Sequence, residues 1–92
     1  MAYKSDLAHK QHYIYRAYIG EELAYIGVTT NPAGRFSNHQ AQKAWWENVT
    51  HITFEEAESR LRAFDSERTY IINERPKYNV AYLEGRQDNG AH

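Results

Sequence analysis

The chain alternates aromatic and β-branched segments with polar ones, and this pattern predicts its secondary structure. Residues 13–19 (YIYRAYI) and 23–28 (LAYIGV) are rich in tyrosine and isoleucine, and Gly20-Glu21-Glu22 lies between them. Aromatic and β-branched residues favour strands, and glycine favours turns. The two segments therefore predict an antiparallel hairpin.

A helix should follow the hairpin, because Asn31 and Pro32 form a helix-start signal. Asparagine caps the first turn, and proline fits the first helical position, where its missing N–H costs nothing. We predict a helix from Pro32 to about Ala44, with Phe36 and Ala44 directed toward the core.

A third strand and a last helix are predicted in the second half of the chain. The β-branched content of residues 48–54 favours a strand. Thr53-x-x-Glu56 has the form of a capping box, so the last helix should begin there and run to about Glu74, before Arg75-Pro76 ends it.

The apolar residues of this last helix predict one stripe that faces the core. Glu67 should border that stripe, and a kink or restart is expected near Asp65-Ser66, since both residues are good helix caps. The predicted stripe consists of Ala57, Leu61, Phe64 and Ile71.

These elements predict an α+β fold, a small antiparallel sheet of about three strands flanked by helices. The 92 residues suit a single domain, with an ordered core at about 12–83 and polar tails at both ends. The chain has no cysteine, which excludes disulfides, thiolate zinc sites and a cysteine nucleophile. No apolar run is long enough to span a membrane and no signal peptide is evident, so we expect a soluble, cytoplasmic protein.

The charge pattern is mixed and modestly uneven. The formal net charge is −1, but residues 1–46 carry five basic against three acidic residues, and residues 47–92 carry six against nine. An ordinary solvated surface explains this asymmetry, and a locally basic face around Lys10, Arg16, Arg35 and Lys43 is the alternative.

Polar side chains suited to phosphodiester chemistry recur in a fixed order. Tyr13-Ile14-Tyr15 and Tyr25-Ile26-Gly27 are followed by Arg35 ten residues after Tyr25 and by His39 four residues later. Glu67 then precedes Asn79 by twelve residues. In this order and spacing the chain resembles the GIY-YIG nuclease family over residues 13–80, although Tyr13 replaces the glycine usual in the first motif.

The resemblance implies a role for each polar residue at one catalytic site. Tyr15 and Tyr25 would face each other across the hairpin, and one of them would take the proton of the nucleophile. Arg35 would bind the scissile phosphate through its planar guanidinium, and His39 would hydrogen-bond the phosphate or relay a proton. Without the other motif residues, two tyrosines on strands and an arginine–histidine pair on a helix would be ordinary packing and surface residues.

The resemblance also implies a metal ion and a DNA substrate. Glu67 would hold one divalent ion, Mg²⁺ or Mn²⁺, since such ions prefer oxygen ligands and keep several waters. Asn79 would form hydrogen bonds near Glu67 and the hairpin and so hold the C-terminal segment in place. We expect Arg16, Lys43 and Arg35 to contact DNA.

The sequence therefore predicts a metal-dependent DNA endonuclease that nicks with little sequence specificity. A homodimer or a targeting partner would supply double-strand cleavage or specificity. The alternative is a nucleic-acid-binding or protein-docking module on the same fold, without turnover.

Overall fold

A computed structural model describes residues 10–79 of the chain. The predicted polar tails, apart from residues 10 and 11, lie outside this range, as do residues 80–83 of the predicted core. The described elements follow the order β1 (His12–Ile19), β2 (Glu22–Thr29), α2 (Pro32–Gln42), the 3₁₀ helix η1 (Ala44–Asn48), β3 (His51–Ala57) and α3 (Arg60–Glu74). The predicted α+β fold with a three-stranded antiparallel sheet is confirmed.

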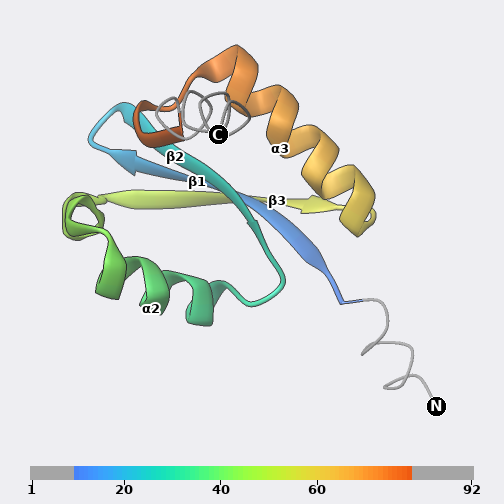
Figure 1. Cartoon of the computed structure of the whole chain (residues 1–92), viewed down its shortest axis with the longest axis horizontal. Coiled ribbons are helices and arrows are strands. Elements are labelled where there is room, and N and C mark those ends of the chain that lie inside the picture. Colours follow the sequence, from blue (N-terminus) through green and yellow to red (C-terminus); the bar gives the residue numbers. More distant parts are fainter. Residues whose placement is uncertain (1–9, 80–92) are drawn as a thin grey trace, which may run out of the picture.

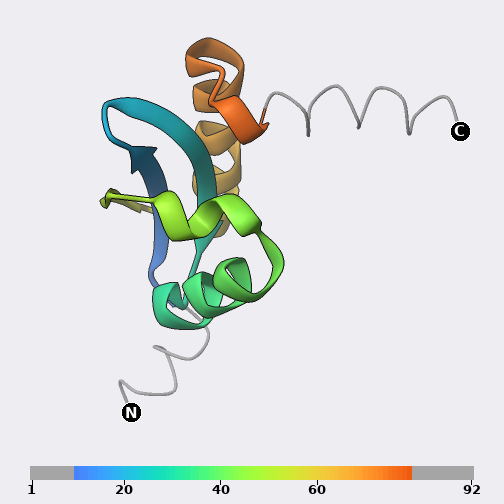
Figure 2. The same cartoon turned by 90° about the vertical axis from the view of Figure 1, so that its left-hand side faces the viewer.

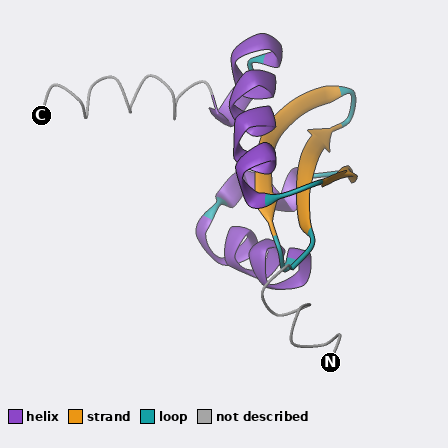
Figure 3. Cartoon of the chain, turned by 90° about the vertical axis from the view of Figure 1, so that its right-hand side faces the viewer, coloured by secondary structure: helices purple, strands orange, loops and turns teal. Residues whose placement is uncertain are grey.

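The sheet is built around the predicted hairpin, with strand order β2-β1-β3. Gly20 makes the hairpin turn possible, because its φ of 62° lies in the left-handed region that favours glycine. In Figure 1 the sheet lies between α3 above and α2 below, and Figure 3 shows α3 running alongside the twisted strands. None of the helices in the described range has the length and apolar content required to cross a membrane.

Helix α2 begins as the sequence predicts but ends earlier. The Asn31 side chain accepts a hydrogen bond from the Gly34 N–H at 3.3 Å, and Pro32 occupies the first turn. The helix ends at Gln42, so the prediction that Ala44 points toward the core is wrong: Ala44 is exposed at the start of η1. The buried residue of α2 is His39.

The predicted start of the last helix is also wrong. Thr53 and Glu56 lie within β3, because pairing with β1 continues to Ala57. Helix α3 instead begins after Ser59, whose hydroxyl accepts a hydrogen bond from the Arg62 N–H at 3.1 Å. A serine cap satisfies the same unpaired N–H groups that the predicted capping box would have satisfied.

Helix α3 is continuous from Arg60 to Glu74, without the break predicted near residues 65 and 66. It ends at Arg75, which adopts a left-handed conformation with φ 48°. A left-handed residue is a common helix terminator, and Pro76 cannot continue the helical hydrogen bonds.

The face of α3 that packs on the sheet differs from the predicted stripe. Leu61 is 80% exposed and Phe64 is 44% exposed, whereas Ala63 and Ile71 are buried. Glu67 lies midway between these two, four residues from each, and is half-buried. The carboxylate therefore sits within the packed face of the helix rather than at its border.

The two faces of the sheet have different roles. Ile14 and Ile26 pack with Ile71 of α3 in the hydrophobic core. Because neighbouring side chains on a strand point to opposite faces, Tyr15 lies on the other side of β1, where it contacts Phe36 of α2 with ring centroids 5.2 Å apart. Figure 2 shows α2 and α3 at different levels along the strands.

Candidate active site

The hydroxyl of Tyr15 is the centre of a buried hydrogen-bond network. It lies 2.6 Å from His39 Nε2, and Arg35 Nε donates a hydrogen bond to it at 3.3 Å. Tyr15 has no exposed surface. Two residues of α2 therefore converge on one phenol of β1, as their spacing of four residues along the helix allows.

The direction of one of these hydrogen bonds follows from the donors available. Arg35 can only donate, so the Tyr15 oxygen accepts from it. The Tyr15 hydroxyl and His39 Nε2 share a second hydrogen bond, whose direction depends on the tautomer of the imidazole.

The charges at this network favour a neutral phenol and a neutral imidazole. Burial raises the pKa of Tyr15 well above its usual range, although the hydrogen bond from Arg35 opposes this effect. Burial also lowers the pKa of His39 to about 4, and the positive charges of Arg35 and Lys43 add to the shift. Near neutral pH, His39 is thus a proton acceptor rather than a cation.

Tyr25 lies beside this network and lines an open pocket. Its ring centroid is 6.1 Å from that of Tyr15, but the register pairs Tyr15 with Gly27, so the two tyrosines are diagonal neighbours rather than directly opposed. The pocket has a volume of about 140 Å³ and lies along one side of α2. It is lined by Tyr25, Arg35, Asn38, His39, Gln42 and Lys43.

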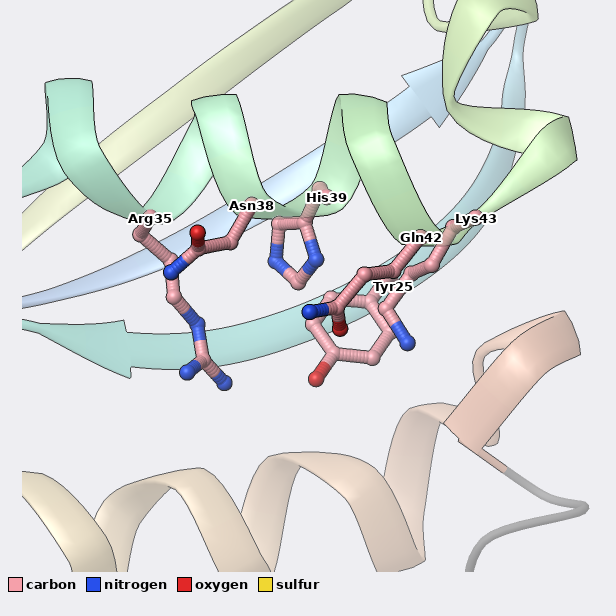
Figure 4. Close-up of a pocket in the computed structure, with 6 residues that line it drawn as sticks. All are labelled: Tyr25, Arg35, Asn38, His39, Gln42 and Lys43. Atoms are coloured by element: carbon pink, nitrogen blue, oxygen red, sulfur yellow. The ribbon is translucent and has the colours of Figure 1, made fainter.

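Figure 4 shows the side chains of Arg35 and Tyr25 extending toward the side on which α3 lies. Hydrogen bonding to Tyr15, followed by smaller contributions that include Tyr25, raises the pKa of Arg35. Lys43, at the end of α2, places its ammonium 5.7 Å from the centroid of the Tyr25 ring. Two cations therefore flank the phenol of Tyr25.

Glu67 of α3 lies near Arg35. Burial raises its pKa, while the positive charge of Arg35 opposes the shift, so the carboxylate and the guanidinium are close enough to interact. No basic side chain of residues 10–79 lies within ion-pair distance of Glu67. The described residues also contain no cluster of three or more acidic or histidine side chains that could hold a metal.

Asn79 joins the end of the described chain to β2. Its side-chain oxygen accepts from the Ile26 N–H at 2.7 Å, and its amide nitrogen donates to the Ile26 carbonyl at 3.2 Å. Because Asn79 is only 3% exposed, these bonds are made away from water. They fix the backbone of β2 next to Tyr25, which agrees with the predicted bonding of Asn79 to the hairpin; no hydrogen bond joins it to Glu67 in the described structure.

Aromatic rings form the wall around the two tyrosines. Trp45 stacks on Tyr78 with centroids 4.2 Å apart, and its ring also lies 5.7 Å from that of Tyr25. Trp46 covers His39, with centroids 4.6 Å apart. Both tryptophans are half-buried, so packing accounts for their positions.

Arg16, predicted to contact DNA, does not reach this site. It lies on the α3 side of β1, where its guanidinium forms two hydrogen bonds with the Glu74 carboxylate at 2.8 and 3.1 Å. It also lies 4.3 Å from the centroid of the Tyr70 ring. Through these contacts Arg16 joins the sheet to α3.

A comparison with protein families identifies this arrangement. A family model of the GIY-YIG catalytic domain matches residues 11–79. The chain belongs to the GIY-YIG nuclease family. Comparisons with curated proteins and with solved structures give no match.

The two GIY-YIG motifs lie on the two paired strands of the hairpin. Residues 13–15 lie on β1 and residues 25–27 on β2. Gly27 is opposite Tyr15, and a Cβ atom added to it would lie 2.5 Å from the Tyr15 Cζ and hydroxyl oxygen. A glycine at this position therefore lets the phenol ring cross β2 and reach Arg35 and His39.

Sequence reasoning identified the polar residues of this GIY-YIG domain but missed part of their surroundings. The contact between Gly27 and Tyr15 was not predicted, although the strand register could have indicated it. Asn38 and Gln42 were also missed, even though they are one helical turn from residues of the site.

Proposed function

We propose that this GIY-YIG domain is a metal-dependent DNA endonuclease that nicks one strand with little intrinsic sequence preference. The observation that carries this proposal is the convergence of Arg35 and His39 on Tyr15, next to a half-buried carboxylate that forms no ion pair within residues 10–79. Such a group combines phosphate binding, proton transfer and a ligand for a hard cation.

Arg35 is the group that binds the scissile phosphate. A guanidinium has five N–H donors, and the hydrogen bond to Tyr15 uses the one at Nε. That bond fixes the plane of the fork, while the terminal N–H groups extend into the pocket. A planar fork held in advance makes charge-assisted hydrogen bonds to phosphate oxygens with little loss of entropy.

Tyr25 is the residue that accepts the proton of the attacking water. Tyr15 is unsuited to this step because its hydroxyl is buried and already hydrogen-bonded to both His39 and Arg35. The Tyr25 phenol lies in the wall of the open pocket, between Arg35 and Lys43. Nearby cations favour negative charge on a phenol oxygen, which makes it a better proton acceptor.

Tyr15 and His39 act as positioning residues for Arg35. The 2.6 Å contact between them holds the phenol where its oxygen can accept from Arg35 Nε. Neutral His39 adds no positive charge next to the guanidinium, because its pKa is about 4. Loss of either side chain should therefore disturb phosphate binding through Arg35.

Glu67 would hold the metal ion. Its carboxylate is half-buried, and burial raises its pKa even though the charge of Arg35 opposes the shift. Because no described basic residue forms an ion pair with it, a bound cation would relieve an unfavourable charge. One carboxylate suits Mg²⁺ or Mn²⁺, which keep several waters and use substrate phosphate as a further ligand. When bound, such an ion would stabilise the charge that develops on the phosphate oxygens.

Low sequence preference and nicking follow from the groups assembled here. The roles of Arg35, His39 and Glu67 all concern the phosphodiester group rather than the bases. Contacts to phosphate carry no direct information about the DNA sequence. The described residues assemble one such site, and one site cleaves one strand. A double-strand break would require a second copy of the chain.

Cleavage of supercoiled plasmid tests this proposal. We expect nicked circles with Mg²⁺ or Mn²⁺, no product with EDTA, and a loss of at least about 10²-fold for Arg35→Ala, as for other groups that stabilise transition-state charge. Folded protein that binds DNA but gives no product with any divalent ion would show a binding module instead. Unchanged cleavage by Arg35→Ala would refute the assignment of the phosphate-binding residue.

A further inference from the structure

Helix α3 and the residue that ends it carry three exposed arginines. Arg60, Phe64 and Arg68 follow one another at intervals of four residues, and Arg75 ends the helix seven residues later. An interval of four returns to nearly the same side of an α-helix, and Arg75 follows directly on the last turn of α3. We call Arg60, Arg68 and Arg75 the arginine ridge.

The ridge arginines have no acidic partners among residues 10–79. Elsewhere in the described chain, Arg16 is paired with Glu74, and Arg62 lies 3.9 Å from Glu58. Arg60 instead lies over the ring of Phe64, 5.6 Å from its centroid. Three unpaired guanidinium groups on one exposed flank form a concentrated positive surface in a chain whose formal net charge is −1.

The orientation of α3 places this ridge on the side of the candidate active site. On the opposite flank, Tyr70 donates to Glu55 of β3, and Glu74 binds Arg16 of β1. Since the strand order is β2-β1-β3, the flank that carries the ridge is turned toward β2, the strand of Tyr25. Arg68 is also the residue after Glu67.

Acidic residues are concentrated away from the ridge. Glu55, Glu56 and Glu58 line a hollow at the end of β3, together with Arg62 on the other flank of α3. A polyanion approaching α3 is therefore attracted to one flank and repelled at the other. This charge separation would orient the protein on its substrate.

We propose that the arginine ridge is a docking surface for the backbone of duplex DNA beside the scissile phosphate. This inference rests on the proposed endonuclease function and names a part of the substrate that Arg35 does not reach. With a rise of about 1.5 Å per residue, Arg60 and Arg75 are about 22 Å apart along the helix. At about 3.4 Å per base pair, the ridge spans about six to seven base pairs.

Phe64 and Ile72 are exposed apolar residues of α3 beside the ridge arginines. They are 44% and 50% exposed, so they would contact the sugars between phosphates bound by the arginines. Phosphate contacts of this kind hold a protein in register on the duplex without reading its sequence. The ridge thus aligns one strand with the site and adds affinity without specificity.

The salt dependence of binding tests this inference. The full chain with Glu67→Gln, in EDTA, would be titrated with a 20-base-pair duplex across a range of salt concentrations. Each lost phosphate contact should reduce the slope of log K against log salt by about 0.9, so Arg68→Gln should reduce it by about that amount. The combination of Arg60→Gln, Arg68→Gln and Arg75→Asn should reduce the slope by about 2.7.

Arg62→Gln is the matched control, because it removes the same charge from the opposite flank of the same helix. It should leave the slope nearly unchanged. An unchanged slope for the triple variant, an equal effect of Arg62→Gln, or no duplex binding by the parent would overturn the ridge proposal.

Plasmid nicking by the same ridge variants with Glu67 restored is scored separately. A ridge-dependent salt slope without nicking by the parent would refute the endonuclease proposal and retain the ridge. Nicking by the parent, together with a salt slope that the ridge substitutions do not change, would refute the ridge and retain the endonuclease proposal.

Discussion

The phenol of Tyr15 crosses directly over Gly27. The two residues are paired in the β1–β2 register, and a side-chain Cβ at position 27 would lie 2.5 Å from the Tyr15 ring and hydroxyl. The Tyr15 hydroxyl is held by His39 and Arg35, so the ring cannot move away without breaking that network. Gly27, the last residue of the second motif, therefore controls the position of Tyr15, the last residue of the first motif.

Gly27→Ala should accordingly damage both stability and cleavage. Inserting a methyl group into this packed contact should lower the free energy of unfolding by about 1–3 kcal/mol. Displacement of Tyr15 should also release Arg35. Urea unfolding and plasmid nicking would measure the two effects.

Gly34→Ala is the control for this substitution. The three atoms nearest to its Cβ all belong to the capping side chain of Asn31, which would have to shift, and none belongs to Tyr15. Alanine also favours the helix more than glycine does. We expect this variant to keep its cleavage activity. Equal losses in the two variants would show that the contact between Gly27 and Tyr15 has no special role.

Asn79→Ala should destabilise the fold through the backbone of β2. The substitution leaves the N–H and carbonyl of Ile26 without their partners in a buried setting, and each unsatisfied group costs about 1–3 kcal/mol. Asn73→Ala, on the exposed surface of α3, should change stability little. Similar urea midpoints for the two variants would contradict the tethering role of Asn79.

Stability should fall as the pH drops from about 6.5 to about 4 because of His39. The pKa of His39 is about 4 in the folded protein and has an ordinary value of 6.5, so in this range the unfolded state binds more protons. The contribution is complete above pH 6.5 and is lost at a rate of at most about 1.4 kcal/mol per pH unit. Glu67 opposes it above pH 4.5, because its raised pKa favours the protonated folded state.

His39→Gln separates these two effects. Glutamine cannot take up a proton, so the variant should lose less stability than the parent between pH 7.5 and pH 5. Unfolding free energies at the two pH values provide the measurement. Parallel losses in both proteins would show that protonation of His39 does not destabilise the fold.

Local sequence signals predicted the parts of the fold that depend on short-range structure. Gly20 marks the hairpin turn, and Asn31-Pro32 marks the start of α2. The signal at Thr53 and Glu56 failed because strand pairing with β1 prevailed over a helix-capping pattern. A pairing of distant segments is not visible in a local motif.

The candidate site was predictable in composition but not in arrangement. Order and spacing identified Tyr15, Arg35 and His39, and the structure joins their side chains. The burial of Tyr15 and the pairing of Arg16 with Glu74 depend on tertiary packing. The sequence therefore could not separate the buried Tyr15 from the half-buried Tyr25 or exclude Arg16 from the site.

Cleavage by Glu67→Gln tests the central claim most directly, because the substitution keeps the shape of the side chain and removes its charge. Burial raises the pKa of Glu67, so a neutral amide should leave the unfolding temperature equal or higher. Glu56→Gln, an exposed position on β3, is the control. We predict that folded Glu67→Gln protein nicks plasmid at least about 10²-fold more slowly than both the parent and the control. Nicking at the parental rate would contradict a metal-dependent endonuclease that uses this site.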